Sequence, residues 1–367
     1  MQLEKNKNIK VTYLYKKGRK NRLENQIPCP SEFFYGYKEL IEEKNLDINF
    51  FEEFDLDLEV KNIFLNKVCN LLSKIIFNFP LNPVIGFLIN KSFKKLNNTD
   101  YIIATTNTLG IILSVAKILN LTRSKILFIN MGLFPKKPNS LKRLFFKYLF
   151  NSIKLLTISK TEYELLKIYF KNNAKYIPFG VDANFWVAKD NVLKNKYVLA
   201  IGNDKARDWE TLIKSWDDTF PFLKIITSLP VKTTKNNIEV IRGNWHAEIL
   251  SDVEMRNLYN NSEFVIIPLK QTYQPSGQST CLQAMSCSKA VIISNIKGIW
   301  DRDLLKHGEN IFFVNPGDQK DLKKGINTLI KDLEMRKRIE KQGRLLIEDH
   351  FNVINMKNNL KTIFEEN

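Results

Sequence analysis

The feature that most constrains the fold is an alternation of short apolar runs with longer helical patterns, which continues along the whole chain. Apolar runs such as 9–15 (IKVTYLY) and 125–130 (KILFIN) have the length and composition of buried strands. Strands that alternate with helices in this way form mostly parallel sheets with helices on both faces. We therefore expect an α/β fold.

The alternation occurs in two successive units, which predicts two Rossmann-like, doubly wound domains facing a central cleft. A chain of 367 residues suits two domains of ordinary size, and its 44% apolar content lets each half bury a core. We place the first domain at residues 1–180 and the second at 190–345, joined by a linker at 177–194. Residues 346–367 are expected to form a C-terminal helix that packs back toward the first domain. Ligands of doubly wound sheets bind at the carboxyl ends of the strands, so we expect the site there.

The expected elements of the first half begin with the strand at 9–15. Residues 16–31 are expected to form a long basic and polar loop, and the next helix to run from Glu32 to Lys44. Further strands are expected at 48–51, 100–105, 125–130 and 155–158. Further helices are expected at 61–95, with a break at 80–83, and at 109–119, 141–151 and 161–170. In the second half, strands are expected at 197–201, 223–227, 238–241, 264–268, 290–294 and 311–314. Helices are expected at 208–216, 252–260, 280–286, 299–306 and 319–331, with a last helical tract at 335–364.

The net charge of +17 is concentrated in the first half of the chain. Residues 1–186 contain 29 Lys and Arg against 16 Asp and Glu, whereas the remainder contains 27 against 23. A basic surface attracts anionic lipid, acidic polymer or nucleic acid. No RNA-binding motif accompanies the charge, so we expect no nucleic-acid partner. Residues 61–95 and 139–156 carry bulky apolar residues and lysines at helical spacing, which suits core helices or helices in an anionic membrane interface. We favour peripheral membrane association.

Nothing in the sequence predicts secretion or a membrane span. The first ten residues are polar, and no run reaches about 18 uninterrupted apolar residues. Four cysteines without a CxxC pair indicate a reducing compartment, and three histidines far apart in sequence do not suit a zinc site. We therefore expect a cytoplasmic protein, on the inner face of the membrane where it associates with one.

The most informative segment is 264–294, in which a buried strand is followed by a polar loop and a helix. Gly277-Gln278-Ser279-Thr280 opens that helix. The first turn of a helix has free N–H groups and a partial positive charge, which suits a phosphate. Gly277 allows close approach to the backbone, and Ser279 and Thr280 can cap the helix and donate to an oxyanion. An ordinary capped helix has the same pattern, so this segment alone leaves both interpretations open.

Two further junctions between strands and loops carry candidate residues. Residues 197–216 place Gly202 at a strand end, then Lys205 and Arg207 in a loop before a helix. A guanidinium there can bind two phosphate oxygens at once, although a solvated basic loop has the same pattern. Residues 176–186 (YIPFGVDANFW) form a strand, a turn and Asp182, which also fits a plain linker.

In combination and in this order, these segments resemble the family-4 glycosyltransferases of the GT-B fold. YIPFGVDANFW is similar to the signature that joins that family's two domains. The other matching segments are the strand and helix before it (155–166, LLTISKTEYELL), the donor loop (197–213), the place of the E-x7-E block (276–292) and a glycine-rich stretch (307–318, HGENIFFVNPGD). The resemblance covers about residues 155–345. The first 150 residues match only in the alternation of strands and helices and, loosely, in two segments, 30–36 (PSEFFYG) and 100–110 (DYIIATTNTLG).

The resemblance implies a nucleotide-diphosphate-sugar donor held by the second domain and a glycan or lipid-linked acceptor held mainly by the first. It implies no metal cofactor. By position, Gly202 corresponds to the family's close-approach glycine and Arg207 to its basic phosphate ligand. Residues 277–280 correspond to the backbone that receives the diphosphate. Gln283 falls where the second glutamate of the block binds the ribose hydroxyls.

Three departures from the family pattern bear on activity. Ser276 and Gln283 replace the two glutamates of the block, and Asn203 replaces an arginine after the glycine. An amide can still hydrogen-bond a ribose diol, so nucleotide binding survives at Gln283. Ser276, or Gln274 or Gln278 beside it, is the candidate for the lost contact with the sugar. Lys205 is the candidate to replace the charge lost at Asn203.

The resemblance implies retaining transfer, and the lack of an obvious base agrees with it. No histidine precedes His246, so the first domain supplies no imidazole. An inverting transfer needs a protein base, whereas a retaining front-face transfer can use the leaving phosphate. Glu32 is the best carboxylate candidate for a base, although an acid at a helix start also favours the helix dipole.

Two other functions stay open on the sequence alone. A sugar-nucleotide 2-epimerase has the same two-domain fold, but it normally needs acids and a histidine for which no clear set is present. A non-catalytic subunit that binds a nucleotide-sugar or a glycan would account for Ser276 and Gln283. A nicotinamide oxidoreductase is disfavoured, because neither strand-to-helix turn carries GxGxxG. We interpret the two D-x-D patterns, 55–57 and 301–303, as helix-start or surface acids rather than metal ligands.

Overall fold

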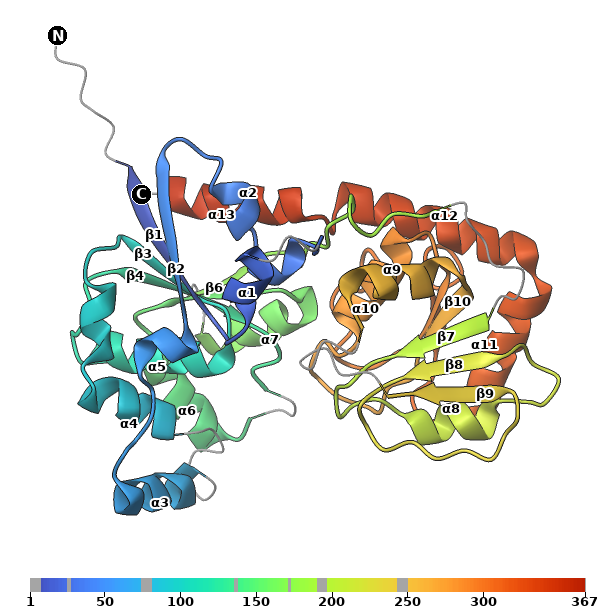
Figure 1. The fold of residues 1–367 in the computed structure, drawn as a ribbon, viewed down its shortest axis with the longest axis horizontal. Coiled ribbons are helices and arrows are strands. Elements are labelled where there is room, and N and C mark those ends of the chain that lie inside the picture. Colours follow the sequence, from blue (N-terminus) through green and yellow to red (C-terminus); the bar gives the residue numbers. More distant parts are fainter. Residues whose placement is uncertain are drawn as a thin grey trace, which may run out of the picture.

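The computed structural model describes residues 8–24, 28–73, 81–134, 138–170, 173–189, 197–242 and 250–366. Two parallel six-stranded sheets form the centres of two domains, and helices surround both sheets (Figure 1). The predicted α/β fold with two doubly wound domains is confirmed.

The first sheet has the strand order β2-β1-β3-β4-β5-β6, with every neighbouring pair parallel. Its strands are β1 Ile9–Tyr15, β2 Leu46–Glu52, β3 Tyr101–Ala104, β4 Lys125–Asn130, β5 Lys154–Thr157 and β6 Ala174–Tyr176. The helices of this domain are α1 Arg19–Glu24, η1 Glu32–Phe34, α2 Tyr37–Leu40, η2 Glu53–Leu56, α3 Ile63–Leu72, α4 Asn82–Ile89, η4 Ser92–Leu96, α5 Asn107–Ile118, α6 Ser140–Leu149 and α7 Lys160–Phe170.

The second sheet has the order β12-β11-β10-β7-β8-β9 and is also parallel throughout. Its strands are β7 Tyr197–Ile201, β8 Leu223–Ile226, β9 Ile238–Ile241, β10 Ser262–Ile267, β11 Val291–Ser294 and β12 Phe312–Val314. The helices in this part of the chain are α8 Trp209–Ser215, α9 Asp252–Asn260, α10 Gln278–Ser286, α11 Gln319–Lys331, α12 Leu333–Asp349 and α13 Val353–Glu365, the last of which packs on the first domain.

Both faces of the sheets are buried, which explains why the strands read as continuous apolar runs. All four side chains of β3 are buried. Ile103 of β3 and Leu127 of β4 belong to one hydrophobic cluster, whereas Ile102 and Phe128 belong to another. Because successive side chains of a strand point to opposite faces, these two clusters are the cores above and below the first sheet.

The direction of the strand crossovers reverses inside each sheet. In the second sheet the reversal lies between β7 and β10, which are neighbours although β8 and β9 separate them in sequence. Ligands of doubly wound sheets bind at the carboxyl ends of the strands that flank such a reversal. The loops after Ile201 and Ile267 therefore flank the expected binding position of the second domain.

The expected helix from Glu32 to Lys44 is wrong. Only the short η1 and α2 form, because Tyr35 and Gly36 adopt left-handed φ angles of 50° and 81°. A left-handed residue ends a right-handed helix. The expected loop at 16–31 is also wrong in part, since it contains the six-residue helix α1. No side chain of α1 is buried, so the sequence carries no apolar periodicity to indicate it.

The expected helix at 299–306 is wrong as well, since turns occupy this segment. The Asp301 carboxylate accepts hydrogen bonds from the N–H groups of Asp303 (3.0 Å) and Leu304 (3.1 Å). Such bonds from a side chain to the local backbone compete with helix formation. The last helical tract is divided into α12 and α13, because the Asn352 side chain caps α13 and accepts from the N–H of Asn355 at 2.9 Å.

The chain crosses between the domains twice, and the two crossings lie side by side. The N–H of Val181 donates to the carbonyl of Phe351 (2.8 Å), and the N–H of Val353 donates to the carbonyl of Val181 (3.2 Å). Beyond the second crossing, α13 extends over the first domain (Figure 1). There the ring of Phe364 contacts that of Tyr101, with 5.0 Å between the centroids.

Candidate functional site

The loops that follow β7 and β10 are joined to each other by backbone contacts. The N–H of Lys270 donates to the carbonyl of Ala206 at 2.7 Å. Arg207 and Leu269 form an antiparallel bridge between the same two loops. The loop of the predicted cation and the loop that leads into α10 are therefore one unit at the reversal point of the sheet.

Arg207 and the first turn of α10 are brought together, as the sequence predicted. The Arg207 Nη2 donates to the Thr280 hydroxyl (3.3 Å), and its Nε donates to the carbonyl of Ile201 (3.2 Å). Its Nη1 lies 3.1 Å from a carboxylate oxygen of Asp204. The side chain is only 2% exposed, so it is not the solvated loop cation of the alternative interpretation. Burial lowers the pKa of the Arg207 guanidinium, and the nearby Asp204 charge opposes that shift.

Two glycines make room for this guanidinium. At Gly202, with φ of 154°, an added Cβ would lie 1.8 Å from the Arg207 Nε. At Gly277, with φ of 77°, it would lie 3.1 Å from Nη1 and 2.8 Å from a methyl group of Ile267. The group that closely approaches the backbone at Gly202 is therefore the Arg207 side chain.

The N-terminus of α10 keeps the properties expected of an anion site. Gly277 occupies the N-cap position, and no side chain of the described residues caps the helix there. The first N–H groups of a helix have no partner within it, so those of α10 can bind an anion. Gln278 and Thr280 are buried, whereas Ser279 and the preceding Ser276 are half-buried.

Asn203 and Lys205 have different positions in the same loop. The Asn203 carbonyl oxygen accepts from the N–H of Ser228 (2.5 Å) and from the Thr227 hydroxyl (3.3 Å). Asn203 thus ties the loops after β7 and β8 together. Lys205 is exposed, next to the loop residues that surround Arg207.

Three glutamines of the second domain donate hydrogen bonds to the first domain. The Gln274 side chain donates to the carbonyl of Gly132 (2.7 Å), and that of Gln278 donates to the carbonyl of Ile158 (2.9 Å). Gln283 donates to the carboxylate of Glu32 at 3.0 Å. Gly132 and Ile158 follow β4 and β5, so the carboxyl ends of both sheets meet at this boundary.

Glu32 is buried at the boundary rather than open to a substrate. Its carboxylate accepts from the indole N–H of Trp186 (2.6 Å), the amide of Gln283 (3.0 Å) and the N–H of Asp182 (3.1 Å). The residue is 0% exposed, and burial raises the pKa of its carboxyl to about 7, although the three donors oppose the shift. Three donors around a buried carboxylate indicate a structural contact and do not favour the predicted role as a base. Gln283 is likewise engaged, since its Oε1 accepts from the Tyr259 hydroxyl at 3.3 Å.

Glu162 is a residue of this boundary that the sequence analysis missed. Its carboxylate accepts from the N–H groups of Gly132 (3.0 Å) and Leu133 (2.6 Å), which belong to the loop after β4. Burial raises the pKa of this carboxyl to about 7. A signal was present, since Glu162 lies in the segment 155–166, but its partners are about thirty residues away and sequence does not reveal them.

The two D-x-D patterns lie outside this unit. Asp55 accepts from the N–H of Glu52 in a capping box at η2. Asp301 is buried and accepts from the Tyr176 hydroxyl at 3.3 Å. Among the residues that the structure describes, no three His, Cys, Asp or Glu side chains gather into a group suited to a metal ion. None of the helices described is long and apolar enough to span a bilayer.

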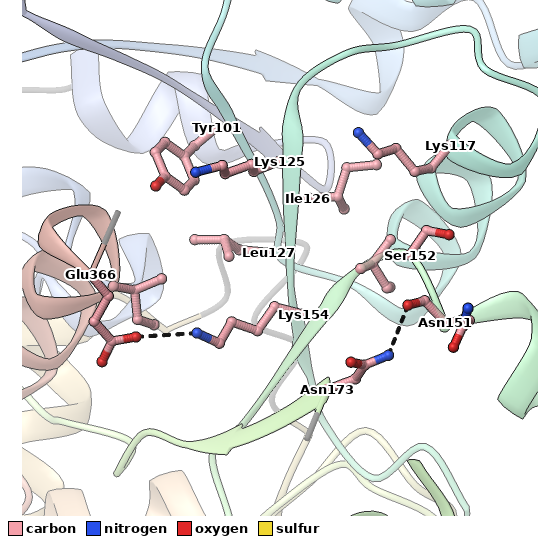
Figure 2. A pocket seen from close by; sticks show the side chains of 12 residues that line it. Tyr101, Lys117, Lys125, Ile126, Leu127, Asn151, Ser152, Lys154, Asn173 and Glu366 are labelled. Atoms are coloured by element: carbon pink, nitrogen blue, oxygen red, sulfur yellow. Dashed lines mark hydrogen bonds and ion pairs between the residues drawn. The ribbon is translucent and has the colours of Figure 1, made fainter. Parts of the chain in front are cut away.

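A cavity of about 380 Å³ lies elsewhere, at the amino ends of the first sheet (Figure 2). Tyr101, Lys125 and Lys154, which line it, begin β3, β4 and β5. Glu366 closes one side and pairs with Lys154 at 3.2 Å. Because ligands of these sheets bind at the carboxyl ends, this cavity is not the candidate site.

Two parallel doubly wound domains whose carboxyl ends meet at one boundary define the class of GT-B folds. Comparison with solved structures agrees. HepE from Anabaena, solved in complex with UDP and glucose, superposes with a TM-score of 0.67 at 15% sequence identity. The alignment covers 98% of this chain and 100% of the HepE chain. Sucrose-phosphate synthase from Thermosynechococcus elongatus has a TM-score of 0.70 at 10% identity, with 98% and 99% covered. WaaG, a glycosyltransferase involved in lipopolysaccharide biosynthesis, has a TM-score of 0.62 at 10% identity, with 98% and 100% covered.

A family model matches part of the second domain. Residues 235–346 match the family described as "Glycosyl transferases group 1", and this stretch includes β10, α10 and the candidate anion site. The predicted resemblance to group 1 glycosyltransferases of the GT-B fold is confirmed, by the family match over residues 235–346 and by the fold over the whole chain. No curated protein gives a significant match.

Proposed function

We propose that this protein transfers a hexose from a nucleotide-diphosphate sugar to a glycan or lipid-linked acceptor. The observation that carries the proposal is the buried Arg207 guanidinium, 3.3 Å from the Thr280 hydroxyl at the start of α10. Both lie at the reversal point of the second sheet, where doubly wound folds bind their ligands. HepE, with the same fold, was solved in complex with UDP-glucose, which supports a nucleotide-sugar donor.

The donor's diphosphate is proposed to bind the first turn of α10. Backbone N–H groups of Ser279 and Thr280 would donate to the phosphate oxygens, since that of Gln278 donates to the carbonyl of Pro275 at 3.4 Å, and Arg207 would contribute a nearby positive charge. Ser276, half-buried just before the helix, is proposed to face the sugar. This arrangement supplies the positive charge that a diphosphate needs, so the proposal includes no metal cofactor.

Transfer is proposed to proceed with retention of the anomeric configuration. The first domain supplies no histidine, and its buried Glu32 accepts three hydrogen bonds from the protein. A leaving phosphate that takes the acceptor proton needs no protein base, which makes a front-face retaining transfer the mechanism that these residues support best.

The acceptor is proposed to be presented at an anionic membrane surface, on the cytoplasmic side. Helix α6 buries Phe146 and Leu149, yet its outer face carries Leu141, Leu144 and Tyr148, which are 78%, 65% and 68% exposed. These three positions, spaced i, i+3 and i+7, form a second apolar stripe where a soluble helix normally has polar residues. The exposed Arg143 and Lys147 on the same helix complement anionic headgroups.

Helix α3 supports the same proposal. Ile63 and Phe64 are 74% and 77% exposed in its first turn, and the exposed Lys67 follows one turn later. Large apolar side chains that are exposed in groups on a basic domain are typical of interaction surfaces. A bilayer suits this combination of apolar and basic groups, and a lipid-linked acceptor would be reached from it.

The donor is tested by titrating UDP, GDP and CMP into the protein and following its thermal stability, since a ligand that binds the native state stabilises it by mass action. We expect one nucleoside diphosphate to bind. Arg207→Lys should weaken that binding by about tenfold or more, because an ammonium cannot reproduce the contacts of a guanidinium. Arg338→Lys, on the exposed face of α12, is the matched control. The proposal is wrong if no nucleoside diphosphate binds at millimolar concentration.

A second candidate function is a non-catalytic subunit that binds a nucleotide-sugar. It is favoured by Ser276 and by the engagement of Gln283 with Glu32 and Tyr259. The two functions differ in turnover. Incubation with the sugar-nucleotide that binds best, and with lipid-linked or glycan acceptors, should give a product whose anomer reports the stereochemistry. Binding without product or hydrolysis would favour the non-catalytic subunit.

A further inference from the structure

The contact between Glu32 and Gln283 joins the donor helix to the opposite domain. Glu32 belongs to η1 of the first domain, Gln283 to α10 of the second, and the 3.0 Å bond between them spans 251 positions of sequence. The same carboxylate holds Trp186 and Asp182 of the linker. One buried carboxylate therefore connects the first domain, the linker and the helix that carries the candidate anion site.

The contact fixes the orientation of the Gln283 amide. Both oxygens of Glu32 accept hydrogen bonds, from the Trp186 indole, the Asp182 N–H and the Gln283 nitrogen, so the Gln283 amide turns its nitrogen to Glu32 and its oxygen to Tyr259. Each end of the amide is engaged once. One N–H and one acceptor position remain, which is the pair that two neighbouring hydroxyl groups of a ribose require.

Gln283 is also placed correctly for a ribose next to the diphosphate. Thr280 and Gln283 are three residues apart on α10, so they share a face of the helix. Thr280, which contacts Arg207, and Gln283 are separated along the helix axis by a rise of about 4.5 Å. A nucleotide whose phosphates bind at the first turn would bring its ribose toward the second.

The surroundings of Glu32 suit an amide at position 283 better than a second carboxylate. Tyr35, Tyr259 and Cys287 are titratable groups that interact with Glu32; they are neutral at pH 7 at their ordinary pKa values, and burial raises the pKa of each further. A glutamate at 283 would put a second carboxylate within hydrogen-bond distance of a buried one. Two carboxylates in such a site cannot both stay ionised at neutral pH.

We propose that Glu32 is a positioning residue for the donor, which orients the Gln283 amide so that it recognises the ribose hydroxyls. The inference rests on the proposed function. Because Glu32 belongs to the other domain, recognition of the ribose requires the two domains to be docked as they are in this structure. Glu32 and Gln283 act as a matched pair in which one member is a carboxyl group and the other an amide.

The test compares UDP with 2′,3′-dideoxy-UDP, which lacks the ribose hydroxyls, by calorimetric titration of the full-length protein; GDP and its dideoxy analogue serve if GDP binds better. The unchanged protein should prefer the ribonucleotide by about tenfold or more, the value of one well-placed hydrogen bond or more. Glu32→Gln should reduce this preference toward one while the affinity for the dideoxynucleotide changes little. A purely structural role would weaken both ligands equally.

A double variant in which the carboxyl and the amide exchange places distinguishes the proposed role from a folding defect. Gln283→Glu alone should lower the melting temperature and weaken UDP binding, because it places two carboxylates together. The double variant Glu32→Gln/Gln283→Glu has one carboxylate and one amide again, so stability and the preference for UDP should recover. Gln271→Glu, at an exposed position of the loop between β10 and α10, is the control for added charge and should change neither.

The outcomes separate this inference from the proposed function. If the unchanged protein binds neither nucleotide, the proposed function fails and the ribose contact fails with it. If it binds UDP and Glu32→Gln keeps the full preference over the dideoxy analogue, the inference alone is overturned. The inference is also overturned if Glu32→Gln and Gln283→Glu each reduce the affinity for UDP independently and the double variant recovers none of it.

Discussion

Arg207 illustrates at the scale of single residues how a buried charge is held in this protein. Its guanidinium occupies the space that side chains at positions 202 and 277 would fill, so both positions are glycine. The carbonyl of Ile201, the hydroxyl of Thr280 and the carboxylate of Asp204 receive its polar contacts. A buried charge is costly unless it is paired and hydrogen-bonded, and these contacts provide both.

Gly202→Ala should therefore disable the candidate site by displacing Arg207. The added methyl group would lie 1.8 Å from Nε, so the guanidinium must move. We expect a loss of stability of about 2 kcal/mol, typical of overpacking a core, and loss of nucleoside diphosphate binding. Urea denaturation and nucleotide titration measure the two effects. Gly308→Ala is the control, because its φ of 73° is also left-handed but no atom lies within 4 Å of the added carbon; it should keep nucleotide binding.

Glu162 should make the stability of the protein depend on pH. Burial raises the pKa of its carboxyl from 4.5 to about 7, so the folded state binds this proton more tightly than the unfolded state. The stabilisation is fully present below pH 4.5 and is lost as the pH rises through 7. Between pH 4.5 and 7, the free energy of unfolding should fall less steeply with pH in Glu162→Gln than in the unchanged protein. The difference in slope is at most about 1.4 kcal/mol per pH unit, the effect of one proton.

Urea unfolding at several pH values measures this slope. Glu164→Gln, exposed on the same helix α7, is the control and should leave the slope unchanged. Glu32 titrates over the same interval, so some slope should persist in Glu162→Gln. A slope identical to that of the unchanged protein would contradict the assignment of a raised pKa to Glu162.

At the scale of elements, the predictable helices and strands are those with a buried face. The strand β3 is visible in the sequence because all four side chains are buried, and α9 is visible because Ser251 and Glu254 form a capping box. The failures have local causes. The left-handed φ angles of Tyr35 and Gly36 end a helix. The Asp301 carboxylate accepts hydrogen bonds from the backbone two and three residues ahead, and turns form there instead of a helix. Neither cause leaves a periodic signal in the sequence.

Helix α6 should contribute to membrane binding through its outer stripe. Leu141→Asn/Leu144→Asn removes two exposed apolar side chains without touching the buried face. Because each leucine that enters an apolar phase contributes about 1.5 kcal/mol or more, binding to vesicles of phosphatidylcholine and phosphatidylglycerol should fall by about tenfold or more. Co-sedimentation with vesicles at low and high salt measures it.

The control for this prediction is Leu333→Asn, which replaces a leucine that is 48% exposed in the second domain. It should bind vesicles like the unchanged protein. If the double variant also binds normally, the stripe is not the membrane contact. If the unchanged protein instead self-associates without lipid and the double variant does not, the stripe is a contact between copies and the membrane proposal fails.

At the scale of the whole molecule, the sequence predicted the part of the site that lies within the second domain but not the contacts between the domains. Gly202, Arg207 and residues 277–280 follow strand ends of the second sheet, so their proximity follows from the order of strands and loops. The contacts of Gln274, Gln278 and Gln283 with the first domain join residues more than a hundred positions apart. Such contacts depend on how the domains dock, which no local pattern in the sequence encodes.

The C-terminal helix should determine the stability of the domain that lies farthest from it in sequence. Phe364 of α13 is 3% exposed and packs on Tyr101, which begins β3 of the first sheet. Lys357 and Lys361 of the same helix pair with Glu43 of the first domain. Phe364→Ala should therefore cost about 3 kcal/mol, the usual penalty for removing a buried aromatic side chain.

The position of this loss distinguishes a helix that completes the first domain from one that merely extends the second. Hydrogen exchange should show lower protection in β1, β3 and β4 of Phe364→Ala, while β7 and β10 keep theirs, because α13 covers the first sheet alone. Ile354→Ala, 51% exposed on the same helix, should change neither sheet. If protection fell equally in both domains, the two would unfold as one cooperative unit, and the linker contacts of Val181 with Phe351 and Val353 would be the structural reason.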